Sequence, residues 1–221
     1  MPEATAPAPT PTTSRSRSSV LAILGCVSAA LAVACVLVAQ LAWGSTTDFP
    51  RVAPEEMADR AFQRSQEAYD VMGFTRIVEP GVEEIGVSTE NTLGSGYCYG
   101  GGLLSLDETV DGAYRMSHRW ALDRVPAGRA VPGLRRLHQH FKANGWEVTS
   151  YREGGAAGDW DLFVQRDGGG ERMSFTWFPD REYFMGGATG PCASDPGWED
   201  GDVSPSGDGL WPPVLGPARL N

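Results

Sequence analysis

The sequence predicts an α+β fold in which two helices pack on an antiparallel β-meander, behind an N-terminal transmembrane helix. Three observations predict it. Residues 20–43 form an apolar run without a charge. Residues 54–72 and 132–145 carry apolar side chains at helical spacing, and strand-like segments joined by glycine-rich turns follow the second of them. Because each of these elements has a single apolar face, the helices must cover the sheet.

The apolar run Val20–Trp43 has the length of a membrane span. As a helix it would reach about 36 Å, enough to cross a hydrocarbon core of about 30 Å. Arg15 and Arg17 precede it, whereas the residues that follow are predominantly acidic. The positive-inside rule therefore places the N-terminus in the cytoplasm and the chain from about Ser45 onward outside the cell.

Two other interpretations of the same run stay open. Cleavage before Ser45, after "AWG", would release the domain as a secreted protein. A lipoprotein signal would end at Cys26 or Cys35, each of which follows a small residue. Apolar residues continue beyond both cysteines, however, and a secretory signal has a shorter apolar region of about 7–15 residues. Length favours the retained span.

The rest of the chain divides by composition. Residues 1–19 are rich in Pro, Thr, Ser and Ala, have no apolar face and are expected to form a disordered cytoplasmic tail. Residues 44–53 are expected as a linker, 54–192 as the extracytoplasmic α+β domain, and 193–221 as a loose acidic tail rich in Pro and Gly.

The charge of the exported part limits its partners. The chain has 28 acidic and 18 basic residues; leaving out Glu3, Arg15 and Arg17 gives 27 and 16, a net charge of −11. Nucleic acids bind to basic surfaces, so nucleic acid is not expected as a partner. The expected partners are the lipid bilayer, through the N-terminal helix, and an unidentified envelope protein.

The first soluble helix is predicted at 54–72. Pro54 suits the first helical position, Glu55 and Glu56 suit the positive end of the helix dipole, and Gly73 suits the end. Residues 74–108 show no clear pattern. The segment "AYRMSHRWALDRV" then alternates as a strand does, with one face made of Tyr114, Met116, His118, Trp120 and Leu122.

A second helix is predicted to open at Pro132 and to end at Gly145. Its apolar stripe consists of Leu134, Leu137 and Phe141, and His140 points away from that stripe. Strand-like segments follow, joined by turns that favour an antiparallel meander. They are "WEVTSY", "WDLFVQR" and "RMSFTWF", with "EYFMGGATG" as a fourth.

No pattern indicates a catalytic, cofactor-binding or metal-binding residue. The glycine-rich stretch 94–102 has neither the strand before it nor the helix after it that a nucleotide loop requires, and is expected as a flexible turn. His138 and His140, two positions apart on a helix, cannot share a metal ion, and His118 lies on the apolar face of its strand. His138 is expected at the boundary of the apolar stripe, and His118 is expected as a core or edge histidine with its hydrogen bonds satisfied.

The acidic residues also have simple structural interpretations. Asp159 and Asp161 flank a hairpin turn, although a pair of carboxylates can hydrolyse glycosides. Acidic residues of the tail resemble a calcium loop only loosely, because Pro205 stands where glycine is needed and no glutamate closes the loop. They are Asp195, Glu199, Asp200, Asp202 and Asp208.

Cys98 and Cys192 are the only cysteines after the apolar run. Outside the cell thiols tend to pair, and two cysteines can satisfy each other. The sequence therefore predicts a Cys98–Cys192 disulfide, with two free thiols and links between molecules as the alternatives.

The order of anchor, helix, strand, "LRRLHQHFKANGWEVTSY", meander and "GPC" resembles that of small membrane-anchored or lipoprotein-like exported proteins of actinobacteria. That resemblance covers the layout of 20–192 and implies no site residues. The expected function is a non-enzymatic binding or interaction domain at the cell envelope. The alternative is an envelope hydrolase with an unrecognised active site. A deep cleft with converging titratable groups favours the enzyme, and a broad exposed apolar patch favours the interaction domain.

Overall fold

The computed structural model describes four stretches of the chain, residues 48–100, 108–154, 158–202 and 204–217. The expected disordered tail, residues 1–19, and the expected transmembrane helix, residues 20–43, lie outside these stretches. Within the four stretches, neither helix combines the length and the apolar content that a membrane span requires.

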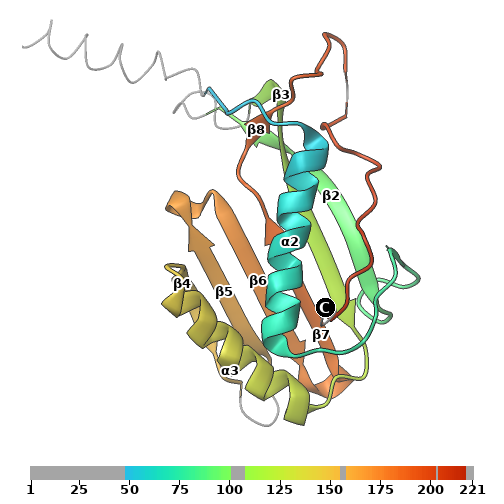
Figure 1. Ribbon diagram of the computed structural model, residues 1–221, viewed down its shortest axis with the longest axis vertical. Helices are drawn as coiled ribbons and strands as arrows, with labels where there is room; N and C mark the ends of the chain where they lie inside the picture. The colour runs from blue at the N-terminus through green and yellow to red at the C-terminus, as the bar shows by residue number, and fades with distance from the viewer. Residues whose placement is uncertain (1–47, 101–107, 155–157, 203, 218–221) are drawn as a thin grey trace, which may run out of the picture. The chain divides into compact units, whose positions relative to one another are not determined.

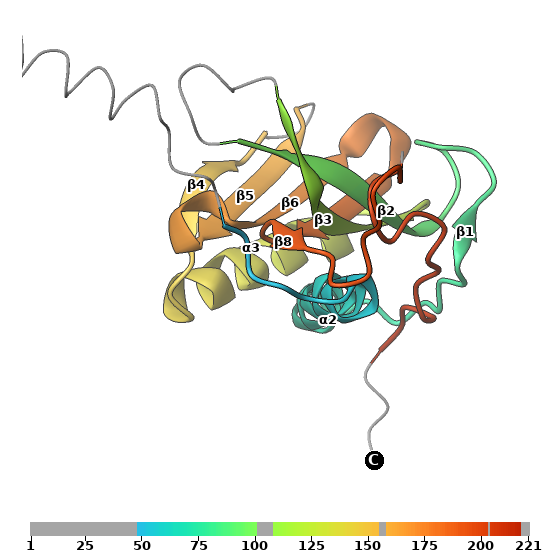
Figure 2. The ribbon, with the colours of Figure 1, turned by 90° about the horizontal axis from the view of Figure 1, so that it is seen from above.

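The described residues form two layers, which confirms the predicted α+β class (Figure 1). Helices α2 (Pro54–Met72) and α3 (Ala127–Ala143) lie on the same face of one sheet, as the view from above shows (Figure 2). Neighbouring strands are antiparallel in the order β1-β2-β3-β7-β6-β5-β4, and β8 pairs with β3. The strands are β1 (Gly81–Val82), β2 (Glu90–Tyr99), β3 (Thr109–Leu122), β4 (Glu147–Arg152), β5 (Trp160–Arg166), β6 (Glu171–Phe178), β7 (Tyr183–Thr189) and β8 (Ala193–Ser194).

Helix α2 has the predicted bounds. Pro54 lies in its first turn, where the missing N–H leaves no hydrogen bond unmade, and Glu55 and Glu56 lie at the positive end of the dipole. Gly73 ends the helix with a φ of 73°, a left-handed conformation that glycine adopts without strain. The face toward the sheet is apolar except for one serine, and its buried residues are Met57, Ala58, Ala61, Ser65, Ala68, Tyr69 and Met72.

Helix α3 begins earlier than predicted. The helix starts at Ala127, after Pro126 at the N-cap, so the predicted first residue, Pro132, lies inside it. Pro132 cannot donate a hydrogen bond to the carbonyl of Gly128, but Gly128 is exposed and water can satisfy that carbonyl. Ala130, which is fully buried, extends the apolar stripe one turn ahead of Leu134 and accounts for the earlier start.

The predicted meander is confirmed. Strands β4, β5, β6 and β7 follow one another as antiparallel neighbours, with single 3-10 turns at η1 (Asp167–Gly169) and η2 (Pro179–Arg181). Strand β7 then pairs with β3, where Gly186 stands opposite Trp120. A Cβ on Gly186 would lie 2.5 Å from the indole ring of Trp120, so a larger residue at this position would displace the ring.

The glycine-rich stretch after residue 94 is part of strand β2 rather than a flexible turn. Residues 94–99 belong to this strand, so their interpretation as a flexible turn is wrong, and 101 and 102 lie outside the described residues. The strand needs no apolar alternation of its own, because backbone pairing with the longer and better patterned β3 stabilises it. Side chains reinforce the pairing: the Ser117 hydroxyl donates to the carbonyl oxygen of Gly94 at 3.2 Å.

Both ends of the described chain pair with the rest of the domain, although both were expected to be loose. In the expected linker, the Val52 N–H donates to the Ser194 carbonyl at 3.1 Å, and the Ser194 N–H donates to the Pro50 carbonyl at 2.9 Å. Ser194 belongs to β8, which pairs with β3. The first residues of the expected acidic tail are therefore part of the sheet.

The last described stretch returns to the core. Leu215 is fully buried in the main apolar cluster, and it exchanges backbone hydrogen bonds of 2.8 and 3.0 Å with Val78. The interpretation of 193–221 as a loose tail is wrong for the described residues between 193 and 217. Burial of Leu215 and the backbone bonds offset the entropy lost when this Pro- and Gly-rich segment is ordered.

The main core lies between the helices and the sheet. Trp120 is its centre, with ring centroids 5.2 Å from Tyr69, 6.0 Å from Phe74 and 5.4 Å from Phe184. The predicted inward face of β3 and the predicted stripe of α3 are both buried. These residues are Tyr114, Met116, His118, Trp120 and Leu122 on β3, and Leu134, Leu137 and Phe141 on α3.

Candidate functional site

The predicted disulfide is present. Cys98 of β2 and Cys192, which precedes β8, are bonded, with their Cα atoms 6.0 Å apart. The two cysteines are 94 positions apart in the sequence, and the bond joins two segments that flank β3. Cys98 is fully buried, so the bond supports the structure rather than presenting a reactive sulfur.

His118 lies in the core of β3, as predicted. Its Nε2 is 2.7 Å from Oδ1 of Asn91, whose amide nitrogen donates to the carbonyls of Val78 at 3.0 Å and Pro213 at 2.9 Å. Because the amide nitrogen is engaged in this way, Oδ1 must accept, and we assign the His118 proton to Nε2. Burial lowers the pKa of His118 to about 4, so the ring is neutral at neutral pH.

His138 lies at the boundary of the α3 stripe, as predicted. Its ring stacks on Tyr151 of β4 with centroids 4.1 Å apart and an interplanar angle of 15°. Desolvation lowers the pKa of His138, and the charge of Lys142 lowers it further. The Tyr151 hydroxyl donates to Glu153 at 2.9 Å, which orients the ring under the histidine. The pair fastens α3 to β4.

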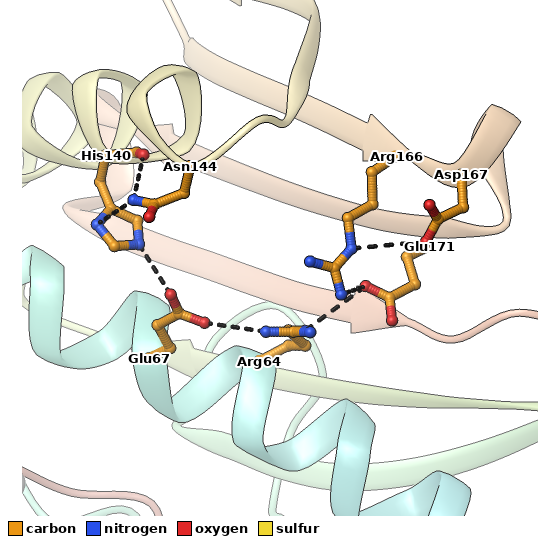
Figure 3. Close-up of polar contacts among 7 residues, drawn as sticks. All are labelled: Arg64, Glu67, His140, Asn144, Arg166, Asp167 and Glu171. Carbon is orange, nitrogen blue, oxygen red and sulfur yellow. Dashed lines mark hydrogen bonds and ion pairs between the residues drawn. The ribbon is translucent and has the colours of Figure 1, made fainter.

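His140 belongs to a chain of charges that joins both helices to the β5–β6 hairpin (Figure 3). His140 Nε2 donates to Glu67 of α2 at 2.9 Å, and Arg64 donates to the other Glu67 oxygen at 3.3 Å. Arg64 Nε is 3.5 Å from Glu171 of β6, which also pairs with Arg166 of β5. We call these five residues the charged chain. His140 points away from the stripe, as expected, and links α3 to α2 through Glu67.

The charged chain has no room for a substrate. The crevice beside it, lined by Arg60, Arg64, Trp146 and Glu171 among others, holds about 10 Å³. A single water needs at least about 10–15 Å³. Trp146, which lines the crevice, is itself covered by the guanidinium of Arg166 at 4.7 Å from its ring. The charged chain therefore acts as a fastening between elements.

The paired aspartates do not face each other across a cleft. Asp161 is buried on β5 and forms an ion pair of 2.9 Å with Arg152 on the neighbouring strand, whereas Asp159 lies exposed before the strand. In the C-terminal segment, Asp195 and Asp202 accept backbone N–H groups at 2.7 and 3.1 Å and so cap turns. Among the described residues no three His, Cys, Asp or Glu side chains gather as metal ligands would.

Two of the hollows that the described surface offers to a small molecule lie away from the gap between α2 and α3. One, of about 260 Å³ over β4 to β7, is lined by hydroxyl and apolar side chains and by Arg172. The other, of about 390 Å³, has Asp111, Asp202, Tyr97 and Trp198 in its wall. Neither wall contains a histidine or a cysteine, so neither offers a nucleophile activated by histidine.

Apolar side chains are exposed where α2 ends. The backbone pairing of Val78 with Leu215 holds two segments side by side, residues 77–87 and 211–214 (Figure 1). The most exposed of them is Ile85, whose side chain is 78% exposed although isoleucine is usually buried. We call this group the apolar end surface; it consists of Ile77 (68%), Val82 (37%), Ile85 (78%), Val87 (56%), Trp211 (72%) and Val214 (46%).

Neither the charged chain nor the apolar end surface was predicted from the sequence. The charged chain draws residues from four elements, and no spacing in the sequence relates them. The apolar end surface did leave a signal. Ile77, Ile85 and Val87 lie near glutamates in a stretch without helical or strand periodicity, where they have no element in which to be buried.

We compared the chain with protein-family models, with curated proteins and with solved structures, and none of the three comparisons found a match. Arguments about function therefore rest on the residues described above.

Proposed function

We propose that the chain is a single-pass membrane protein, with its N-terminus in the cytoplasm, that presents a non-enzymatic α+β domain outside the cell to bind another envelope protein. One observation carries the proposal, the apolar end surface. Single exposed apolar residues are common on soluble domains, but six on two adjoining segments are typical of a surface that a partner covers. An envelope hydrolase is the second choice, because the charged chain borders no space for a substrate.

The charges around the apolar end surface define the partner. Glu79, Glu83 and Glu84 are exposed between its apolar residues, and the described residues give none of the three an ion-pair partner. A partner that places apolar side chains on this surface and basic side chains around it would satisfy both features. An anionic lipid surface would be repelled by the same three carboxylates.

Site-specific photocross-linking in intact cells tests the proposal. A photoreactive side chain at Ile85 is expected to give one discrete product with an envelope protein, and the same side chain at Lys142, exposed on α3, is expected to give none. Trp211→Ser should lower the yield of the Ile85 product, because it removes apolar area from the same surface. Lys142→Ser should leave that yield unchanged.

Two results would contradict the proposal. Equal products from Ile85 and Lys142 would mean that collisions, not a binding surface, produce the cross-links. A product from Ile85 that carries lipid instead of protein would identify the apolar end surface as a membrane contact.

A further inference from the structure

A second feature, separate from the apolar end surface, is a cavity between the end of α2 and the start of α3. Its volume is about 220 Å³. A single water needs at least about 10–15 Å³, so the cavity has room for a small molecule. Its wall comes from the segment after α2, the loop after β3 and the first turn of α3: Gly73, Phe74, Thr75, Arg76, Leu122, Arg124, Val125, Pro126 and Arg129.

The wall of this cavity is basic, although the exported part of the chain has a net charge of −11. Arg76, Arg124 and Arg129 line it, and no acidic residue does. Asp123 lies behind the wall, where it accepts from Arg76 at 2.8 Å and from Arg124 at 2.8 Å. The described residues offer the Arg129 guanidinium neither a hydrogen bond nor an ion pair. Three guanidinium groups and one carboxylate leave a local charge of +2.

Asp123 stays charged and holds the arginines in place. Burial by itself would raise the pKa of Asp123, but the hydrogen bonds and charges of Arg76 and Arg124 outweigh it and lower that pKa. Arg76 also donates to the main-chain oxygen of Asp123 at 2.6 Å. Arg76 and Arg124 are thus held to Asp123 beside the cavity, with 40% of the Arg76 side chain and 82% of the Arg124 side chain exposed.

The backbone of Arg124 is strained in a way that favours a role for its side chain. Its φ of 52° is a left-handed conformation that glycine adopts freely and arginine does not. The conformation is imposed by the next residue, because the Val125 N–H donates to Glu182 at 2.6 Å and its carbonyl accepts from Trp177 at 2.9 Å. Strain of this kind is found at ligand-binding sites.

The floor of the cavity is apolar. Phe74, Leu122 and Val125 line it with exposed fractions of 8%, 1% and 4%. We propose that the cavity binds a small amphipathic anion, a phosphate or carboxylate that carries a short apolar chain. The arginines would hold the anionic group by charge-assisted hydrogen bonds, and the floor would cover the chain. A hollow of about 220 Å³ suits a small soluble molecule better than a two-chain lipid.

Phosphorus NMR of the full-length chain in neutral dodecyl maltoside micelles tests the proposal with butyl phosphate as the probe. Butyl phosphate should bind more tightly than inorganic phosphate, which cannot use the apolar floor. Arg129→Gln should weaken the binding by about 10-fold, the effect of losing one charged hydrogen bond. Lys142→Gln is the matched control, since it removes the same charge from the other end of α3, and it should change the affinity little.

Arg124→Gly separates binding from folding. Glycine relieves the backbone strain, so this variant should unfold at the same temperature as the unsubstituted chain or at a higher one, and yet bind butyl phosphate less tightly. The proposal is overturned if Arg129→Gln and Lys142→Gln weaken binding equally, if either arginine variant binds as the unsubstituted chain does, or if inorganic phosphate binds as tightly as butyl phosphate.

Discussion

Single residues in this domain are held by polar partners as well as by packing, and His118 is the clearest case. The Asn91 amide, fixed by two carbonyls, decides which ring nitrogen of His118 carries the proton. The other ring nitrogen, Nδ1, is buried without a hydrogen-bond partner among the described residues. A neutral histidine tolerates this arrangement, whereas a charged one would bury an unpaired N–H and a charge.

His118 predicts an acid-sensitive fold. Its folded pKa of about 4 lies below the ordinary 6.5, so the unfolded chain takes up the proton first as pH falls, and stability is lost between about pH 6.5 and pH 4. Between pH 7 and pH 4.5 the loss is about 2 kcal/mol. Urea unfolding at both values should show this extra loss relative to His118→Gln, which keeps an N–H for Asn91 but does not titrate. An equal loss in both proteins would assign the acid sensitivity to other groups.

Phe141 and His140 are neighbours with different roles. Phe141 is 1% exposed, and Phe141→Ala should cost about 3–5 kcal/mol because it leaves a cavity. From the sequence, a substitution of His140 is expected to cost little, under about 0.5 kcal/mol. Since His140 bonds to Glu67 across the helices, we now expect His140→Ala to cost about 1 kcal/mol. Chemical denaturation measures both, and a His140→Ala cost equal to that of Phe141→Ala would contradict this account of α3.

At the scale of elements, weakly patterned segments gain their structure from well-patterned ones. Strand β2 is ordered along β3, the segment at Pro50–Val52 along β8, and the last described stretch along Val78. Each relies on backbone hydrogen bonds to its neighbour instead of an apolar face of its own. Such elements are expected to depend on their neighbours for stability.

Leu215 tests this dependence. It lies 0% exposed in the main core, in a segment that composition alone marks as a loose tail. Leu215→Ala should cost about 2–5 kcal/mol of unfolding free energy, because it empties a fully buried site. The adjacent Val214→Ala is the control and should cost under about 0.5 kcal/mol, since Val214 is 46% exposed. Similar small values for both would mean that the segment does not pack as described.

At the scale of the whole domain, the Cys98–Cys192 bond limits the freedom of the unfolded chain. It closes a loop with a sequence separation of 94, for which the chain-entropy model gives roughly 4–5 kcal/mol at most. The Cys98→Ser, Cys192→Ser double variant should lose up to that amount in urea unfolding. Mass spectrometry after alkylation without reductant should find a Cys98–Cys192 linked peptide, and two labelled thiols would refute the bond in the exported protein.

A retained span, as proposed, would set how the chain lies in the membrane. Arg15 and Arg17 precede an apolar run of the length of a bilayer core. Protease added to intact, cell-wall-stripped cells should therefore digest the α+β domain and spare the N-terminal tail. A soluble domain found in the medium, beginning near Ser45, would instead establish the cleaved signal.

The sequence by itself determined the elements that carry their own apolar pattern. Helix α2, the inward face of β3, the stripe of α3 and the meander from β4 to β7 could all be predicted, because spacing of 3.6 or 2 residues reports a buried face directly. Cys98 and Cys192 could be paired because no other cysteine follows the apolar run.

Only the tertiary structure decided the rest. Strand β2 and the buried Leu215 depend on partners far away in the sequence, and a local pattern cannot report such contacts. The charged chain, the apolar end surface and the cavity of Arg76, Arg124 and Arg129 each gather residues from several segments. The physical reason is the same in each case: side chains that act together at a surface need proximity in space, and backbone pairing between distant segments supplies it without any periodic signal in the sequence.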